Sequence, residues 1–233
     1  MELIRLDRII RGAGIATRKE IIELVKQGRV TVNGEAAEAI SQRCDPAWDI
    51  RVDGIPVKME PTVCLMMNKP AGYLTATASE KEPPITDLLP EQYRNFFPVG
   101  RLDLDSEGLL LFTNDGDLCH RVIMPVSEIV KEYYIEVTGT FAPDTKERIQ
   151  AGIEVDNGLV CLPADIEIAP NGKSAHVFVS EGKRHQVKRM ALAAGARVRY
   201  LKRLAIGSLR LDEQLKPGEF RRLTEAEIAA IFE

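Results

Sequence analysis

The residues of this chain that are best placed to do chemistry are two aspartates in a short polar loop. Asp103 and Asp105 lie between Gly100 and Gly108, and Arg101 stands beside them. The apolar run that follows predicts a buried strand, which would hold the loop in place. A carboxylate fixed in this way can act as a nucleophile or as a metal ligand, whereas the same residue types are also typical of a solvated turn. The loop alone leaves these alternatives open.

A strand with two adjacent tyrosines is the second candidate. Residues 131–137 alternate in a pattern that predicts a strand, so Tyr133 and Tyr134 would point to opposite faces of a sheet. A strand tyrosine usually packs in a core or an interface. Tyr134 therefore competes with Tyr133 for any role in a site on this strand.

A basic segment at residues 180–190 is the third candidate, and it predicts a helix that starts near Arg184. The buried stripe of this helix would consist of Val187, Met190, Ala191 and Ala194. Arg184 and Lys188 would share another face, and so would His185 and Arg189. The three histidines of the chain do not fall at metal-ligand spacing, so we do not expect a metal site here.

The charge distribution indicates a phosphate-rich partner in spite of a net charge of −4. Residues 173–222 contain 13 Lys and Arg against 4 Asp and Glu, and the first 30 residues contain 7 against 4. The remainder of the chain must then carry a net charge of −16. Charge segregated in this way can form a basic face on an acidic protein, as binding to a nucleic-acid backbone requires. A solvated surface with ion pairs is the alternative.

Residues 1–58 predict a compact module of two helices and a small sheet. Thr17 and Glu20 form a capping box at the start of the second helix, and Asn33-Gly34 and Asp53-Gly54 predict tight turns. Through Ala-Thr-Arg-Lys-Glu and Gly-Arg-Val-Thr-Val-Asn-Gly the module resembles the αL RNA-binding domain shared by a small-subunit ribosomal protein and tyrosyl-tRNA synthetases. The resemblance implies that its helices present basic side chains to RNA, here Arg5, Arg8, Arg18, Lys19 and Lys26.

A second, larger domain is predicted for residues 63–233, after a linker at residues 59–62 in a proline-containing break. Strands are expected at residues 63–67, 109–113, 133–138, 174–179 and 197–206, and helices at about 115–123, 143–151, 184–194 and 225–232. Thr224 and Glu227 form another capping box. This mixture favours an α+β fold with a mainly antiparallel, mixed sheet.

Four segments of this domain together resemble the pseudouridine synthases, over residues 63–222. They are Asn-Lys-Pro-x-Gly at 68–72, Gly-Arg-Leu-Asp at 100–103, Lys-x-Tyr at 131–133 and Glu-Gly-x-x-His-Gln-Val-Lys-Arg-Met at 181–190. The valine that follows the tyrosine in the family comes one position late, at Val137. The length, the N-terminal module and the Val-Lys-Arg-Met ending are similar to the RsuA-type group, which acts on small-subunit ribosomal RNA.

The resemblance implies roles for three residues. Asp103 would be the nucleophile, Tyr133 would stack on the target uracil and take part in proton transfer, and Lys188 would pair with Asp103 and keep it ionised. Related families carry an arginine where this chain has Lys188. The Asn-Lys-Pro-x-Gly segment supports the resemblance without naming a role. With the charge pattern, the RNA-binding candidates are Arg5, Arg8, Arg18, Lys19, Arg101, Arg184, His185, Gln186, Arg189 and Arg203.

We therefore expect an enzyme that converts a specific uridine of ribosomal RNA, most simply 16S rRNA, to pseudouridine. An isomerisation needs no ATP, and the sequence has no phosphate-binding loop motif, so neither cofactor nor metal is expected. A monomer in the cytoplasm, acting on rRNA or a partly assembled subunit, is the simplest expectation, since no apolar run reaches the length of a membrane span. The alternatives are a 23S rRNA synthase, a non-catalytic rRNA-binding or assembly protein, and a metal-dependent phosphodiesterase that uses Asp103 and Asp105.

Overall fold

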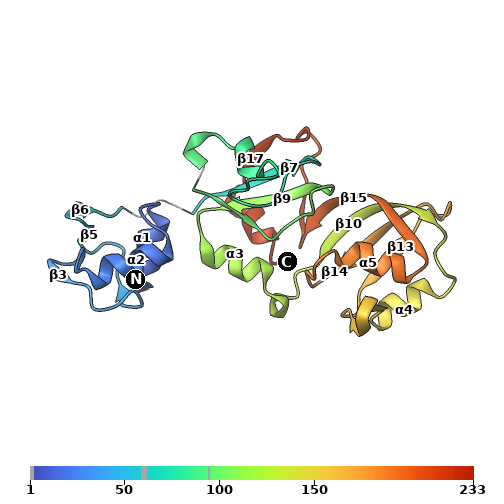
Figure 1. The fold of residues 1–233 in the computed structure, drawn as a ribbon, viewed down its shortest axis with the longest axis horizontal. Coiled ribbons are helices and arrows are strands. Elements are labelled where there is room, and N and C mark those ends of the chain that lie inside the picture. Colours follow the sequence, from blue (N-terminus) through green and yellow to red (C-terminus); the bar gives the residue numbers. More distant parts are fainter. Residues whose placement is uncertain (1–2, 59–61, 94) are drawn as a thin grey trace. The chain divides into compact units, whose positions relative to one another are not determined.

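The computed structural model describes residues 3–58, 62–93 and 95–233 (Figure 1). The chain divides into two compact units, one made of Met1–Val63 with Asn114–Gly116 and the other of Cys64–Thr113 with Asp117–Glu233. Most of the linker predicted at residues 59–62 lies outside the described residues. Among those that are described, no helix has the length and apolar character that a membrane crossing requires.

The first unit begins with two helices, as its sequence predicts. Helix α1 (Leu6–Gly12) follows strand β1 (Ile4–Arg5), and helix α2 is formed by Arg18–Lys26. The capping box is confirmed, because the Thr17 amide donates to the Glu20 carboxylate at 2.7 Å and the Thr17 hydroxyl accepts from the Glu20 amide at 3.4 Å.

Short strands complete the first unit. Their bounds are β2 Val30–Val32, β3 Glu35–Ala36, β4 Arg43–Cys44, β5 Ile50–Val52 and β6 Ile55–Pro56. Strands β3, β2, β5 and β6 pair in that order, and β1 pairs with β4. Both predicted turns are confirmed: Asn33 and Gly34 join β2 to β3 with φ of 52° and 88°, and Asp53 and Gly54 join β5 to β6 with φ of 53° and 76°.

The second unit is built on a mixed sheet, and the predicted α+β class is confirmed. Its main strands run in the order β13-β14-β10-β15-β9-β7-β17, with β8 on β9 and β16 on β15. The pairs are antiparallel except for β9 with β15, which are parallel. The bounds are β7 Cys64–Lys69, β8 Phe97–Val99, β9 Glu107–Thr113, β10 Lys131–Gly139, β13 Asp165–Ile168, β14 Ser174–Val179, β15 Ala196–Ile206, β16 Leu209–Arg210 and β17 Phe220–Arg222.

Four helices, a two-stranded pair and several 3₁₀ turns complete the described secondary structure of this part of the chain. The helices are α3 (Gly116–Ile123), α4 (Thr145–Ala151), α5 (Gln186–Ala193) and α6 (Glu225–Ala230), and β11 (Glu154–Val155) pairs with β12 (Leu159–Val160). Single 3₁₀ turns lie at Ile85–Leu88, Glu91–Tyr93, Pro125–Ser127 and Asp156–Gly158. The capping box predicted for Thr224 and Glu227 is confirmed at the start of α6.

Helix α5 packs its apolar stripe on the sheet, and this packing fixes the direction in which its basic side chains point. Val187, Met190, Ala191 and Ala194 are all buried in one core cluster with residues of β10, β14 and β15, so the predicted stripe is confirmed. The predicted start near Arg184 is wrong, however. The helix begins at Gln186, because His185 before it has a left-handed backbone with φ of 52°. Arg184 and His185 therefore lie outside the helix, and the face-sharing pairs expected for them do not form.

Candidate active site

The loop that carries Asp103 is fixed by the ammonium of a buried lysine. Lys69, at the end of β7, is 0% exposed, and its Nζ donates to three backbone carbonyls. These are the carbonyls of Pro70 at 2.9 Å, Asp103 at 3.1 Å and Ser106 at 2.8 Å. Burial lowers the pKa of Lys69 to about 8, although the charges of Asp105, Glu107 and Asp103 act to raise it. One side chain thus holds the backbone of the loop at both of its ends.

The segment after Lys69 completes this support. The Gly72 amide donates to the Leu104 carbonyl at 2.7 Å. The Thr75 hydroxyl donates to the Leu102 carbonyl at 2.7 Å and accepts from the Leu102 amide at 3.2 Å. The Asn-Lys-Pro-x-Gly segment therefore has a structural role that its resemblance to the family did not name. The signal in the sequence was a lysine within the same strand as the apolar residues 64–67.

The Asp103 carboxylate lies against a cation from helix α5. Lys188 Nζ is 3.0 Å from Asp103 Oδ2 and 2.6 Å from Asp105 Oδ1, so one ammonium joins the two aspartates. Burial alone would lower the pKa of Lys188, but its hydrogen bonds to Asp105 and Asp103 raise it above the usual value. Burial would raise the pKa of Asp105, and the bond to Lys188 lowers it below the usual value. Lys188 therefore stays charged at neutral pH beside Asp103.

The turn before α5 brings a histidine to the same carboxylate. His185 Nε2 is 3.5 Å from Asp103 Oδ1. The turn is held by Glu181, which is 7% exposed and accepts from Gln186 Nε2 at 2.7 Å, while Gln186 Oε1 accepts from the Lys183 amide at 2.9 Å. Gln186 is 5% exposed. Its amide binds Glu181 and the Lys183 backbone, and Gln186 also lines the pocket that contains Asp103, so its contact with RNA stays a prediction.

Tyr133 and Tyr134 point to opposite faces of β10, and only Tyr133 faces the aspartate loop. Tyr133 lines the same pocket as Asp103 and packs at the edge of the α5 core. Tyr134 lies on the other face, where its hydroxyl donates to Glu136 at 3.3 Å and its ring contacts His176. The alternation of side chains along a strand predicted that the two tyrosines point to opposite faces, and the structure shows that Tyr133 is the one at the pocket.

Arg203 lies inside the protein, and this burial contradicts the prediction that it contacts RNA directly. Its side chain belongs to β15, directly opposite Tyr133 in β10, and the residue is 4% exposed. Its guanidinium donates to the Leu109 carbonyl at 2.7 Å and to the Tyr133 hydroxyl at 3.4 Å. Sequence alone could not tell this residue from the exposed arginines of the same strand.

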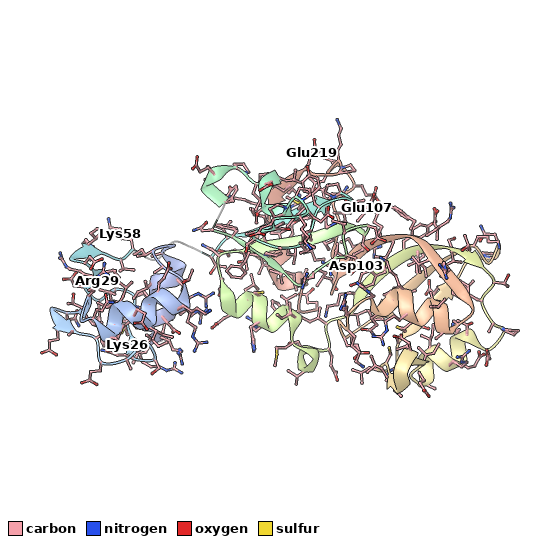
Figure 2. The ribbon with its side chains drawn as sticks, viewed as in Figure 1. Lys26, Arg29, Lys58, Asp103, Glu107 and Glu219 are labelled. Atoms are coloured by element: carbon pink, nitrogen blue, oxygen red, sulfur yellow. The ribbon has the colours of Figure 1, made fainter. Side chains whose placement is uncertain are left out.

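These side chains surround one concave site in the middle of the second unit, where Figure 2 labels Asp103. The lining includes Arg101, Asp103, Ser106, Tyr133, Glu181, Lys183, His185, Val187, Lys188 and Leu201. A partly exposed carboxylate, a paired ammonium and an aromatic hydroxyl are thus gathered from three separate segments of the chain. This set can hold a flat polar ring, attack it or its sugar through the carboxylate, and exchange protons through the phenol.

The remaining basic candidates differ in their ion pairs and in their exposure. The buried Asp7 binds Arg5 at 2.9 Å and lies 3.6 Å from Arg18. Arg189 Nε is 2.5 Å from Asp156. Arg8, which is half-buried, lies 3.6 Å from Asp115. Lys19, Arg101 and Arg184 are exposed. Throughout the described residues, no group of three or more His, Cys, Asp or Glu side chains is arranged to hold a metal ion.

Comparison with known proteins agrees with this geometry. Residues 63–193 match the model of the RNA pseudouridylate synthases, and residues 4–47 match the S4 domain. An uncharacterised RNA pseudouridine synthase of Bacillus subtilis (strain 168) is 40% identical over 96% of each chain. The ribosomal small subunit pseudouridine synthase A of Yersinia pestis is 34% identical over 97% of each chain. A crystal structure of a pseudouridylate synthase superimposes with a TM-score of 0.71 and 30% identity, covering 98% of this chain and 99% of that one.

The family model spans more than half of the chain, and relatives of this identity span nearly all of it. The resemblance drawn from four short segments is therefore confirmed, as is that of the N-terminal module. This chain belongs to the RNA pseudouridine synthase family, as an enzyme with an N-terminal S4 domain.

Proposed function

We propose that this enzyme isomerises a specific uridine of 16S ribosomal RNA, with Asp103 as its nucleophile. The observation that carries the catalytic part is the Lys188 ammonium, 3.0 Å from the Asp103 carboxylate in a concave site. An ammonium at this distance forms an ion pair with the carboxylate and can hold it in place for the attack. The choice of 16S over 23S rRNA rests on the Yersinia pestis relative, which is named for the ribosomal small subunit.

The reaction exchanges one bond for another at the ribose. Asp103 attacks the target nucleotide and bonds to it, the bond between the ribose carbon and N1 breaks, and the base turns. C5 then bonds to the ribose carbon in place of N1, and the bond to Asp103 breaks, which restores the free carboxylate. N1 gains a proton and C5 loses one, so atoms and charge balance without a cofactor. Tyr133 lines the site and carries the hydroxyl suited to these two transfers. Lys188 and His185 keep the carboxylate in place during the attack.

The target uridine must leave the base stack of the RNA to enter the pocket, and unstacking it costs about a few kcal/mol of free energy. We assign the backbone contacts that offset this cost to residues 1–58 as an RNA-docking module and to exposed basic residues around the pocket, such as Arg101 and Arg184. Residues 63–233 then form the catalytic domain. We expect the enzyme to act as a monomer in the cytoplasm, on rRNA or a partly assembled subunit.

Pseudouridine mapping in the rRNA of a strain that lacks this gene tests the proposal. We expect one 16S position to lose pseudouridine, to regain it with the wild-type gene, and not to regain it with Asp103→Asn. Asp105→Asn should have a milder effect. A lost position in 23S rRNA would refute the substrate, and restoration by Asp103→Asn would refute the nucleophile. Unchanged rRNA together with defective subunit assembly would favour a non-catalytic role.

A further inference from the structure

Arg203 is a buried cation that lacks an acidic partner. Across the described chain, no Asp or Glu forms an ion pair with this residue, although it is 4% exposed. Its Nε and Nη1 donate to the Leu109 carbonyl and the Tyr133 hydroxyl. Its Nη2 is one of two buried side-chain atoms among the described residues that have no hydrogen-bond partner, the other being Ser106 Oγ in the pocket lining. Burying a charge in this way is costly, so a compensating use is expected.

A second cation lies close to it. Lys131 is on the same strand as Tyr133, two residues earlier, and its Nζ donates to the carbonyls of Ile129 at 2.6 Å and Ser180 at 3.5 Å. Burial, and then the charge of Arg203, lower the pKa of Lys131 to about 8. Two basic side chains thus lie on the strands around Tyr133, Arg203 opposite it in β15 and Lys131 two residues earlier in β10.

The backbone places Arg203 with little freedom. In β15 it is opposite Tyr133 of β10 on one side and opposite Gly108 of β9 on the other. A Cβ atom on Gly108 would come within 2.3 Å of the Arg203 carbonyl, so the strands approach closely at this point. The guanidinium centre lies 5.9 Å from the Tyr133 ring centroid. Arg203 is thus fixed by two strands at once beside the tyrosine.

We propose that Arg203 is a positioning residue for the reaction, which orients the Tyr133 hydroxyl and stabilises negative charge on its oxygen. This inference rests on the proposed role of Tyr133 in proton transfer. When Tyr133 gives its proton to N1, its oxygen becomes a phenolate, and when it takes the proton released from C5, the phenol is restored. Between these two transfers the phenolate would be held by Nη1 of Arg203, and the unpartnered Nη2 provides a further donor close by.

The test compares three substitutions in the full-length enzyme. Arg203→Met removes the charge, Arg203→Lys keeps it, and Arg199→Met is the matched control. Arg199 belongs to the same strand, but its side chain is 63% exposed and pairs with Glu136 at 2.7 Å. Single-turnover rates and RNA dissociation constants are measured on an RNA that the wild type converts, each also in a Tyr133→Phe background.

We expect Arg203→Met to lower the single-turnover rate by about 30-fold, as for the loss of one charge-assisted bond in proton transfer. Arg203→Lys should recover part of this rate, and Arg199→Met should lose none. RNA affinity and its salt dependence should not change, because Arg203 makes no phosphate contact. In the Tyr133→Phe background, Arg203→Met should add about threefold or less, since the hydroxyl through which it acts is already absent.

Three results would overturn the assignment. Weaker RNA binding with a smaller salt slope would make Arg203 a phosphate contact after all. An equal rate loss with and without the Tyr133 hydroxyl would mean that Arg203 acts elsewhere. Urea unfolding is also measured for the wild type, Arg203→Met, Tyr133→Phe and the double variant. Additive unfolding costs in this set would show that the two side chains do not interact, whatever the activities of the variants. Asp103→Asn, assayed in parallel, separates the two proposals: rate retained there refutes the nucleophile, whereas rate lost there but kept in Arg203→Met refutes only Arg203.

Discussion

The structure predicts a specific, pH-dependent loss of unfolding free energy for the substitution Lys69→Met. The methionine keeps most of the side-chain volume and removes the ammonium that donates to the carbonyls of Pro70, Asp103 and Ser106. Each bond from a charged donor is worth about 1.5 to 3 kcal/mol. The substitution also removes the cost of burying the Lys69 charge, and this gain partly offsets the lost hydrogen bonds. The difference between the ordinary pKa of 10.5 and the value of about 8 in the folded protein corresponds to about 3 kcal/mol.

The net cost at neutral pH is therefore about 1.5 to 6 kcal/mol of unfolding free energy, because three lost bonds outweigh one relieved charge. The cost should also grow with pH. Between pH 8 and 10.5 the unfolded chain keeps a proton that folded Lys69 has released. The free energy of unfolding of the wild type then rises with pH in this window. The contribution of Lys131, whose pKa is also about 8, is present in both proteins and cancels in their difference.

Urea unfolding followed from about pH 7 to about pH 10 measures both effects. We expect the gap between wild type and Lys69→Met to widen by about 2 to 3 kcal/mol across this range. Lys146→Met, which removes an exposed lysine from α4, should unfold within about 0.5 kcal/mol of the wild type at every pH. A gap that stays constant with pH would show that Lys69 is not a buried, charged anchor, and would refute the explanation of how the Asp103 loop is held.

Three further predictions follow from the site and the modules. Lys188→Met should lower the single-turnover rate by about tenfold or more, because Asp103 loses the ammonium at 3.0 Å, and an unchanged rate would contradict the pairing. Gly108→Ala should cost about 3 kcal/mol or more in thermal or urea unfolding, since its Cβ would meet the Arg203 carbonyl at 2.3 Å, whereas Gly34→Ala, with open space around it, should cost about 1 to 2 kcal/mol. Replacing both Arg18 and Lys19 by Met should weaken rRNA binding and reduce its salt slope by about one to two units, and binding that keeps its salt slope would remove this face from the docking surface.

Local signals in the sequence predicted the local structure well. Both capping boxes and both tight turns are present, because each depends on side chains and φ angles within four residues. The apolar stripe of α5 and the main strands also followed from periodicity. The same periodicity extended α5 two residues too far, to Arg184. Glu181 and Gln186 bind one another there and fold the preceding turn back, and no local pattern encodes that contact.

The structural features that the sequence did not predict depend on contacts between segments that are far apart in the chain. The short strand β17 exists only because it pairs with β7, far back in the chain, and β13 because it pairs with β14. Lys69 and Arg203 look like surface residues in sequence, and both are buried because other strands and loops close over them. The family motifs indicated which residues gather at the site. The partners that hold them could be read only once the sheet was assembled.

The position of β15 has a consequence for how this enzyme is made. It is hydrogen-bonded to β10 on one side and to β9 on the other, and it follows both in the chain by more than fifty residues. During synthesis, the aspartate loop and the tyrosine strand emerge before β15, which is parallel to β9 and antiparallel to β10. Pairings of such long sequence separation fold slowly and leave strand edges open meanwhile. The nascent chain therefore gains its active site only late in its folding, once β15 has been made and has paired with both β9 and β10.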